Sequence, residues 1–254
     1  MSGSWRAAAS TTYGIAVLLA SSAMARAQIP TDDKWHYGVS PYGWLVGLSG
    51  TVGIGPVASS VDLDPNDILK MLEFGIMGYV EARHGPWVFS ADGIYANLGT
   101  GRVIAVRGDT GRLEYSQYET IIQPMVGYAK AGPRWNVDFV GGFRYWNMGA
   151  TLDVDRTKRP SNSHSGSRAW ADVTVGLRGR WVPYDRIRVV GAYDGGGGGS
   201  NGTWQLYGSL GYEAWTRWTF SAAYRALSVN YNRQNFLFDT VTKGFLIGVT
   251  YSFQ

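Results

Sequence analysis

The sequence of 254 residues contains no cysteine, only three histidines and no long apolar run. Without cysteine the chain forms no disulfide bond, and we expect no lipid anchor attached through a thiol. A membrane-spanning helix needs about 20 consecutive apolar residues, so we expect no such helix. Charged residues make up 17% of the chain, and the formal net charge is +4. A charge this close to balance gives no reason to expect a nucleic acid as a partner.

The start of the chain has the pattern of an export signal. Arg6 supplies a positive charge, residues 13–20 (YGIAVLLA) form a short apolar core, and Ala-Arg-Ala at 25–27 matches the small-residue cleavage motif. We therefore expect residues 1–27 to be a cleaved signal peptide and residues 28–254 to form one exported domain.

The rest of the chain alternates between apolar and polar residues with a period of two, which is typical of strands with two different faces. We predict ten strands, at residues 35–52, 73–84, 87–99, 112–131, 135–152, 167–182, 187–195, 202–214, 217–232 and 241–253. Eight strands are the alternative, if the segment at 187–195 or part of the first strand, which contains Pro41, is a loop. An even number of strands places both termini on the periplasmic side of an outer membrane.

Four short turns each have a tryptophan beside them, and the loops at the opposite strand ends are longer. These tryptophans are Trp87, Trp135, Trp181 and Trp218. Tryptophan concentrates at membrane interfaces, because an apolar ring with a polar N–H suits a half-hydrated layer. The pattern predicts an all-β fold, a closed antiparallel transmembrane β-barrel with short periplasmic turns and longer extracellular loops. A soluble sandwich or lipocalin-like barrel, with its apolar face inward, is the alternative.

The last strand alternates regularly and ends in Tyr251 and Phe253. It resembles the C-terminal signal of outer-membrane barrels that the insertion machinery recognises, except that Gln254 displaces the final aromatic residue by one. We therefore expect the insertion machinery and the lipid and lipopolysaccharide of the outer membrane to be partners.

Two segments carry a wider resemblance. They are residues 40–52 (SPYGWLVGLSGTV) and 193–205 (YDGGGGGSNGTWQ), followed by LGY at 210–212 and AYR at 223–225. Together they resemble a family of small proteobacterial outer-membrane β-barrel proteins without a settled function, and more loosely the outer-membrane protein A and W types. The resemblance implies residence in the Gram-negative outer membrane and carries over no functional residue.

The polar faces of the predicted strands carry an unusual number of charges. The residues expected to point into the lumen are Glu81, Arg83, Asp92, Asp138, Arg144, Asp172, Arg178, Arg180 and Arg225. Charges in a narrow lumen persist only if they are paired and hydrogen-bonded. The set predicts either an ion-pair network that fills the lumen or a small water-filled channel. Because arginine suits fixed bidentate pairs, we favour a plug, and we expect Arg144→Ala to raise conductance.

The first long loop has two interpretations. Residues with the spacing of a calcium loop are Asp62, Asp64, Asn66 and Glu73. Such a loop needs glycine where Asp67 stands. We instead predict a short helix capped by Asp64, with Pro65 in its first position. Its apolar stripe would consist of Ile68, Leu69 and Leu72.

Two further segments are predicted to be loops. The glycine run at 194–200 indicates a flexible hairpin loop, because no lysine or helix pattern supports a phosphate-binding loop. A later basic segment contains Arg156, Lys158, Arg159, His164 and Arg168. Its charges suit lipopolysaccharide phosphates, although a plain solvated loop has the same composition.

The sequence favours a structural or passive function, with slight or gated permeation of small solutes. We expect no metal, no cofactor and no catalytic residue. The three histidines, His36, His84 and His164, lie near short turns or in a polar loop, where a nucleophile and its base lack a fixed geometry. On this ground we expect that the chain is not an enzyme. The alternatives are a lipid A-modifying enzyme and an adhesin or receptor that uses loops 53–72 and 153–168.

Overall fold

The computed structural model describes residues 32–54, 57–106, 109–156 and 162–254, so the predicted signal peptide lies outside the described residues. No helix in these ranges is long and apolar enough to cross a membrane. The strands are β1 (Trp35–Ile54), β2 (Val57–Leu63), β3 (Leu72–His84), β4 (Trp87–Val106), β5 (Asp109–Gly132), β6 (Trp135–Arg156), β7 (Asn162–Tyr184), β8 (Ile187–Gly198), β9 (Gly202–Trp215), β10 (Trp218–Arg233) and β11 (Phe236–Phe253). The helix α1 spans Pro65–Met71.

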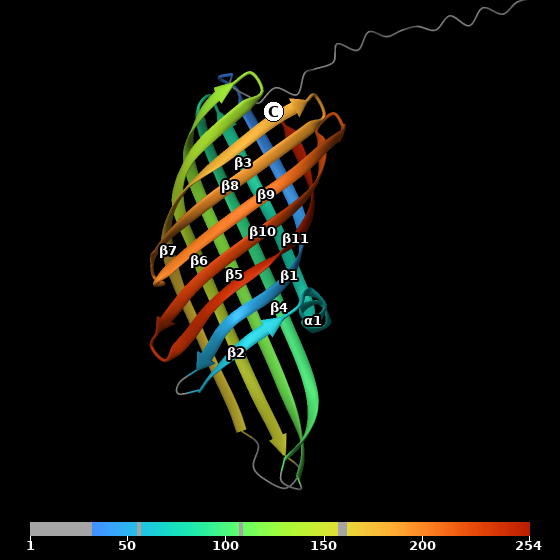
Figure 1. The fold of residues 1–254 in the computed structure, drawn as a ribbon, viewed down its shortest axis with the longest axis vertical. Helices are drawn as coiled ribbons and strands as arrows, with labels where there is room; N and C mark the ends of the chain where they lie inside the picture. Colours follow the sequence, from blue (N-terminus) through green and yellow to red (C-terminus); the bar gives the residue numbers. More distant parts are fainter. Residues whose placement is uncertain (1–31, 55–56, 107–108, 157–161) are drawn as a thin grey trace, which may run out of the picture.

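Ten of these strands close into an antiparallel barrel (Figure 1). Neighbours in sequence pair from β3 to β11, and β11 pairs with β1 to close the wall. The eleventh strand, β2, pairs only with β1. The prediction of ten barrel strands is therefore confirmed, and the alternative of eight is wrong.

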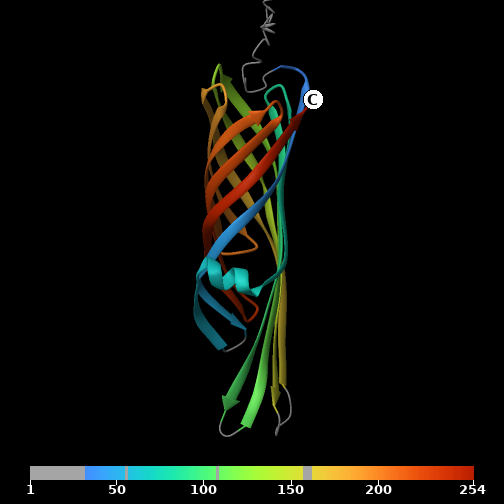
Figure 2. The same ribbon diagram turned by 90° about the vertical axis from the view of Figure 1, so that its right-hand side faces the viewer.

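The two ends of the barrel differ in shape (Figure 2). The end that we call the turn end carries the C-terminus and the two-residue turns at 85–86, 133–134, 185–186 and 216–217. At the opposite end, the hairpin end, the β4–β5 and β6–β7 hairpins project beyond the other strands. Short turns at one end and long excursions at the other are the layout that the sequence predicts. The predicted loop between residues 232 and 241 is wrong, because β10 and β11 are joined at the hairpin end by a two-residue turn at 234–235.

The seam between β1 and β3 explains the first long loop. The two strands pair only from Trp35 opposite His84 to Pro41 opposite Gly78. Toward the hairpin end β1 pairs with β2 instead, and α1 connects β2 to β3.

The short helix begins as the sequence predicts. The Asp64 carboxylate accepts hydrogen bonds from the backbone N–H groups of residues 66 and 67, and Pro65 opens the helix. The predicted apolar stripe is correct only at Ile68, which is buried. Leu69 and Leu72 are exposed, and Leu72 lies beyond the helix at the start of β3.

The outer surface of the barrel carries an exposed apolar band. Val175 on β7 and Ile247 on β11 are 66% and 68% exposed. In water, such exposure would lose the favourable free energy of burial, about 25 cal/mol for each Å² of apolar surface. In a bilayer these side chains meet lipid instead. The apolar faces therefore point outward, which contradicts a soluble barrel with an apolar interior.

Exposed aromatic residues border this band at the turn end and also occur farther along the wall. At the turn end Trp87, Trp135, Trp181 and Trp218 are all exposed on the outer surface. A second group lies nearer the hairpin end and consists of Tyr95, Tyr193, Trp204 and Tyr224. Aromatic residues at the edge of an apolar band are typical of transmembrane barrels.

The glycine run is not a loop, and that prediction is wrong. Gly195–Gly198 continue β8 and pair with β7, and the chain turns only at residues 199–201. The two strands approach so closely that a Cβ atom on Gly196 would lie 1.8 Å from the Val173 carbonyl oxygen. Glycine is needed here for close packing between strands.

Candidate functional site

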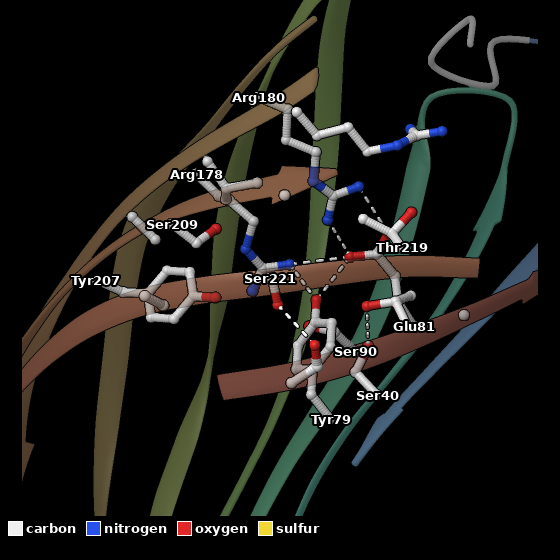
Figure 3. Close-up of a pocket in the computed structure, with 18 of the residues that line it drawn as sticks. Ser40, Tyr79, Glu81, Ser90, Arg178, Arg180, Tyr207, Ser209, Thr219 and Ser221 are labelled. Carbon is white, nitrogen blue, oxygen red and sulfur yellow. Dashed lines mark hydrogen bonds and ion pairs between the residues drawn. The ribbon is translucent and has the colours of Figure 1, made fainter. Parts of the chain in front are cut away.

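The lumen near the turn end contains an ionic group that we call the Glu81 cluster. Its members are Tyr79, Glu81, Arg83, Asp138, Arg178 and Arg180. Glu81 accepts hydrogen bonds from Arg83 at 2.7 Å, from Arg178 at 3.1 Å and from Arg180 at 2.8 Å. Figure 3 shows the two β7 guanidinium groups converging on this one carboxylate. Three arginines therefore share two carboxylates, Glu81 and Asp138.

A second polar group, the central layer, crosses the middle of the lumen. It contains Tyr42, Asp92, Gln123, Arg144, Asp194, Thr203 and Arg225. Arg144 is fully buried and pairs with Asp194, and Arg225 pairs with Asp92 at 2.7 Å. The Arg225 guanidinium also lies 4.9 Å from the centre of the Trp44 ring, a cation–π geometry. Each arginine in this layer has its own carboxylate.

Toward the hairpin end the lumen is closed by an apolar layer. Its buried members are Trp44, Ile94, Ile121, Trp146, Met148, Trp170, Leu227, Val229, Tyr231, Phe236 and Phe238. The Trp170 ring stacks on Tyr231 with centroids 4.1 Å apart and on Trp146 at 5.7 Å. Trp146 and Trp170 are cross-strand neighbours on β6 and β7, and the cluster they share with β1, β4, β5, β10 and β11 fills this part of the lumen with apolar side chains.

The half of the lumen near the turn end is hollow. A cavity of about 590 Å³ extends from the central layer, where Asp92 and Gln123 line it, to the turn end. There it is lined by Arg217 and Gln254, which are exposed. The cavity thus opens at the turn end and stops at the central layer.

The mouth of the cavity carries weaker polar contacts. His36 hydrogen-bonds with Asp32, and this bond lowers the pKa of the Asp32 carboxyl. Arg188 and Glu213 form a pair at 2.5 Å that is partly exposed. Within the described residues no group of three or more metal-ligating side chains occurs.

The structure places all nine predicted lumen charges on the inner face of the wall. Eight of them form ion pairs. The exception is Asp172, which accepts a hydrogen bond from the Ser200 backbone N–H at 2.6 Å. It therefore fixes the β8–β9 turn instead of neutralising an arginine.

Several lumen residues escaped the sequence reasoning. They are Tyr42, Gln123, Asp194 and Thr203. Asp194 was hidden because it begins the glycine run, although its alternation with Arg188 and Val190 already indicates an inward side chain. Arg168, counted with the basic segment but already inside the predicted strand at 167–182, lies in β7 and donates to the Gln234 carbonyl at 2.7 Å. Residues 157–161 of that basic segment lie outside the described residues.

Comparisons with known proteins show which structures this fold resembles. No protein-family model and no curated protein matches the chain. The solved outer membrane protease OmpT from Escherichia coli is 10% identical over 89% of this chain and 99% of its own, with a TM-score of 0.56. The translocator domain of the autotransporter NalP from Neisseria meningitidis is 13% identical over 87% and 89%, with a TM-score of 0.42. Ail, the attachment invasion locus protein of Yersinia pestis, is 12% identical over 86% and 98%, with a TM-score of 0.31.

The chain is an outer-membrane β-barrel. Its turn end then faces the periplasm and its hairpin end faces outward, as in bacterial barrels. The cavity of the outer-membrane barrel is accordingly open to the periplasm and closed toward the outside.

The expectation that the chain is not an enzyme is wrong. The Escherichia coli barrel that shares its fold is a protease, so this architecture holds a catalytic site in at least one protein. The expectation rested on three histidines, but carboxylates also act as general acids and bases. His36 and His84 lie at the turn end as predicted, whereas His164 belongs to β7 and not to a loop.

Proposed function

We propose that this barrel has a structural role in the outer membrane and passes small solutes only when its lumen rearranges. One observation carries the proposal: the central layer and the apolar layer close the lumen in succession between the periplasmic cavity and the outside. A packed apolar layer excludes hydrated ions, because an ion that enters it loses its hydration shell.

We also propose the partners and the kinship that the sequence indicates. The apolar band and the tryptophans at its turn-end edge suit outer-membrane lipid and lipopolysaccharide as surroundings. Phe253 stacks on Tyr37 of β1 with ring centroids 5.3 Å apart, which supports a role for the last strand in insertion and closure. The kinship with small proteobacterial barrels, and more loosely with outer-membrane proteins A and W, rests on residues 40–52 and 193–205.

The conductance of layered variants tests the closed lumen. Trp146→Ala with Trp170→Ala opens the apolar layer, and Arg144→Ala with Asp194→Ala removes one ion pair from the central layer. We expect the unaltered protein and each double variant to be silent in planar bilayers, and the fourfold variant to conduct. The sequence alone led us to expect that Arg144→Ala would raise conductance. We now expect this single variant to stay silent, because the apolar layer remains in place.

A matched control removes two tryptophans from the outer surface, as Trp181→Ala with Trp204→Ala. When these two substitutions are combined with Arg144→Ala and Asp194→Ala, the protein should not conduct, because neither the Trp181 ring nor the Trp204 ring lies in the lumen. Steady conductance by the unaltered protein would show an open pore and would contradict the proposal.

The projecting hairpins favour a second function, recognition at the cell surface. Beyond Leu98, β4 pairs only with β5, and before Asp172, β7 pairs only with β6. Unpaired strand edges can accept a strand of another protein. We expect cells whose β4–β5 and β6–β7 hairpins are shortened to the barrel rim to lose adhesion to a matrix-coated surface, measured by counting attached cells. Unchanged adhesion, with the shortened protein still folded, would argue against this role.

A further inference from the structure

The charge balance of the periplasmic cavity is incomplete. The central layer and the Arg188–Glu213 pair are neutral by themselves. The Glu81 cluster has one arginine more than it has carboxylates. At the mouth Arg217 has no ion-pair partner among the described residues. Asp172 in the lumen and Asp32 at the mouth also lack an arginine partner, so the surplus positive charge is local to the Glu81 cluster, where an anion is favoured.

Arg178 presents a vacant face to this cavity. Its Nη1 donates to Glu81 and to the Tyr79 hydroxyl, while its Nε and Nη2 have no hydrogen-bond partner in the described part of the chain. The side chain keeps 13% of its surface exposed, and the residue lines the cavity. The Nε–H and Nη2–H bonds of a guanidinium form a side-on fork, which matches the two oxygens of a carboxylate.

The remaining wall of the cavity is rich in hydroxyl groups. Tyr207 and Ser209 on β9 line it, and neither hydroxyl has a hydrogen-bond partner in the described ranges. Ser221 on β10 also lines it and donates only a long bond of 3.4 Å to the Gly248 carbonyl. Figure 3 shows these three side chains with Arg178 among the residues around the cavity. Hydroxyls that are free to donate or accept suit a ligand that itself carries hydroxyl groups.

We infer that this cavity binds a small hydroxylated carboxylate that enters from the periplasm, with its carboxylate on the Nε/Nη2 fork of Arg178. A volume of about 590 Å³ lies in the range of small-molecule sites. Glu81 and Tyr79 hold the guanidinium from its other side, so the fork is oriented before the ligand arrives. This site goes beyond the proposed function, because binding from the periplasm does not require that the barrel ever conducts.

Calorimetry with glucuronate tests the site, and glucose serves as the uncharged counterpart. We expect the refolded protein to bind glucuronate and not glucose. Arg178→Lys keeps the charge beside Glu81, and with it the fold, but removes the fork. It should weaken glucuronate binding at least about tenfold, the typical value of one charge-assisted bidentate contact. Arg134→Gln removes an exposed arginine on a periplasmic turn and should leave binding unchanged.

The outcomes separate clearly. Absence of glucuronate heat up to about 10 mM, a concentration that detects even millimolar affinity, would overturn the site. Equal affinity of Arg178→Lys and the unaltered protein would overturn the assignment to the Arg178 fork. Inorganic phosphate binding in place of glucuronate would overturn recognition of a planar carboxylate. A silent bilayer recording leaves the binding result untouched, so failure of this inference and failure of the proposed function are distinguishable.

Discussion

Replacing Glu81 with glutamine is expected to destabilise the barrel by about 3–5 kcal/mol, the typical cost of breaking a buried ion pair. Glu81 accepts hydrogen bonds from Arg83, Arg178 and Arg180. Without its charge, Asp138 would be the only carboxylate for three guanidinium groups. The repulsion among them is weakly screened, because the cluster is largely buried within the barrel wall. Urea unfolding in lipid vesicles, followed by tryptophan fluorescence, measures the change.

Two companion variants separate charge from packing. Glu213→Gln breaks the partly exposed pair with Arg188 and should cost less than about 1 kcal/mol. Adding Arg180→Gln to Glu81→Gln removes one surplus charge and should recover part of the lost stability. If Glu81→Gln and Glu213→Gln shifted the unfolding midpoint equally, the Glu81 cluster would not be the ionic centre of the lumen.

The faces of the strands were predictable because a barrel in lipid follows one simple rule. Period-two alternation separates the lipid face from the lumen face, so inward positions such as Arg83 and Arg144 can be read from the sequence. The ion-pair partners of these residues cannot be read from the sequence. Arg83 meets Asp138 and Arg144 meets Asp194, pairs that depend on strand register and barrel shear, which alternation leaves open.

The strands of the two long hairpins extend farther than the sequence predicts, for a related reason. β4 was expected to end at residue 99 but continues to Val106, and β6 was expected to end at residue 152 but continues to Arg156. Beyond the membrane both faces of a strand meet water, so the apolar alternation that marks a strand is lost. The ladder between neighbouring strands continues there without it.

The cavity and the closing layers could not be predicted for a third reason. Tryptophan in a barrel sequence indicates a girdle position, yet Trp146 and Trp170 point inward and are buried. Their parity already differs from that of Trp135 and Trp181, which lie an odd number of residues away on the same strands. Parity thus separates lumen tryptophans from girdle tryptophans, although it does not tell which other buried side chains these rings meet in the lumen.

Gly196→Ala is expected to cost about 3 kcal/mol, the upper part of the range for overpacking, and to lower the yield of folded barrel. The added Cβ would lie 1.8 Å from the Val173 carbonyl oxygen and 2.9 Å from the Thr174 Cα. Both atoms belong to the backbone of β7, so no side chain can rotate away. The two strands must separate, which moves Asp194 away from Arg144 and weakens the central layer.

Gly191→Ala is the matched control on the same strand, because a Cβ atom there meets nothing within 4 Å. It should be neutral or slightly stabilising, since alanine restricts the unfolded chain more than glycine does. The heat-dependent mobility of each variant on a gel gives the folded fraction, and urea unfolding gives the stability. If the two variants behaved alike, close approach of β7 and β8 would not be what requires glycine at position 196. The run would then be the flexible segment that its composition indicates, and Asp194 would lose the rigid strand that holds it against Arg144.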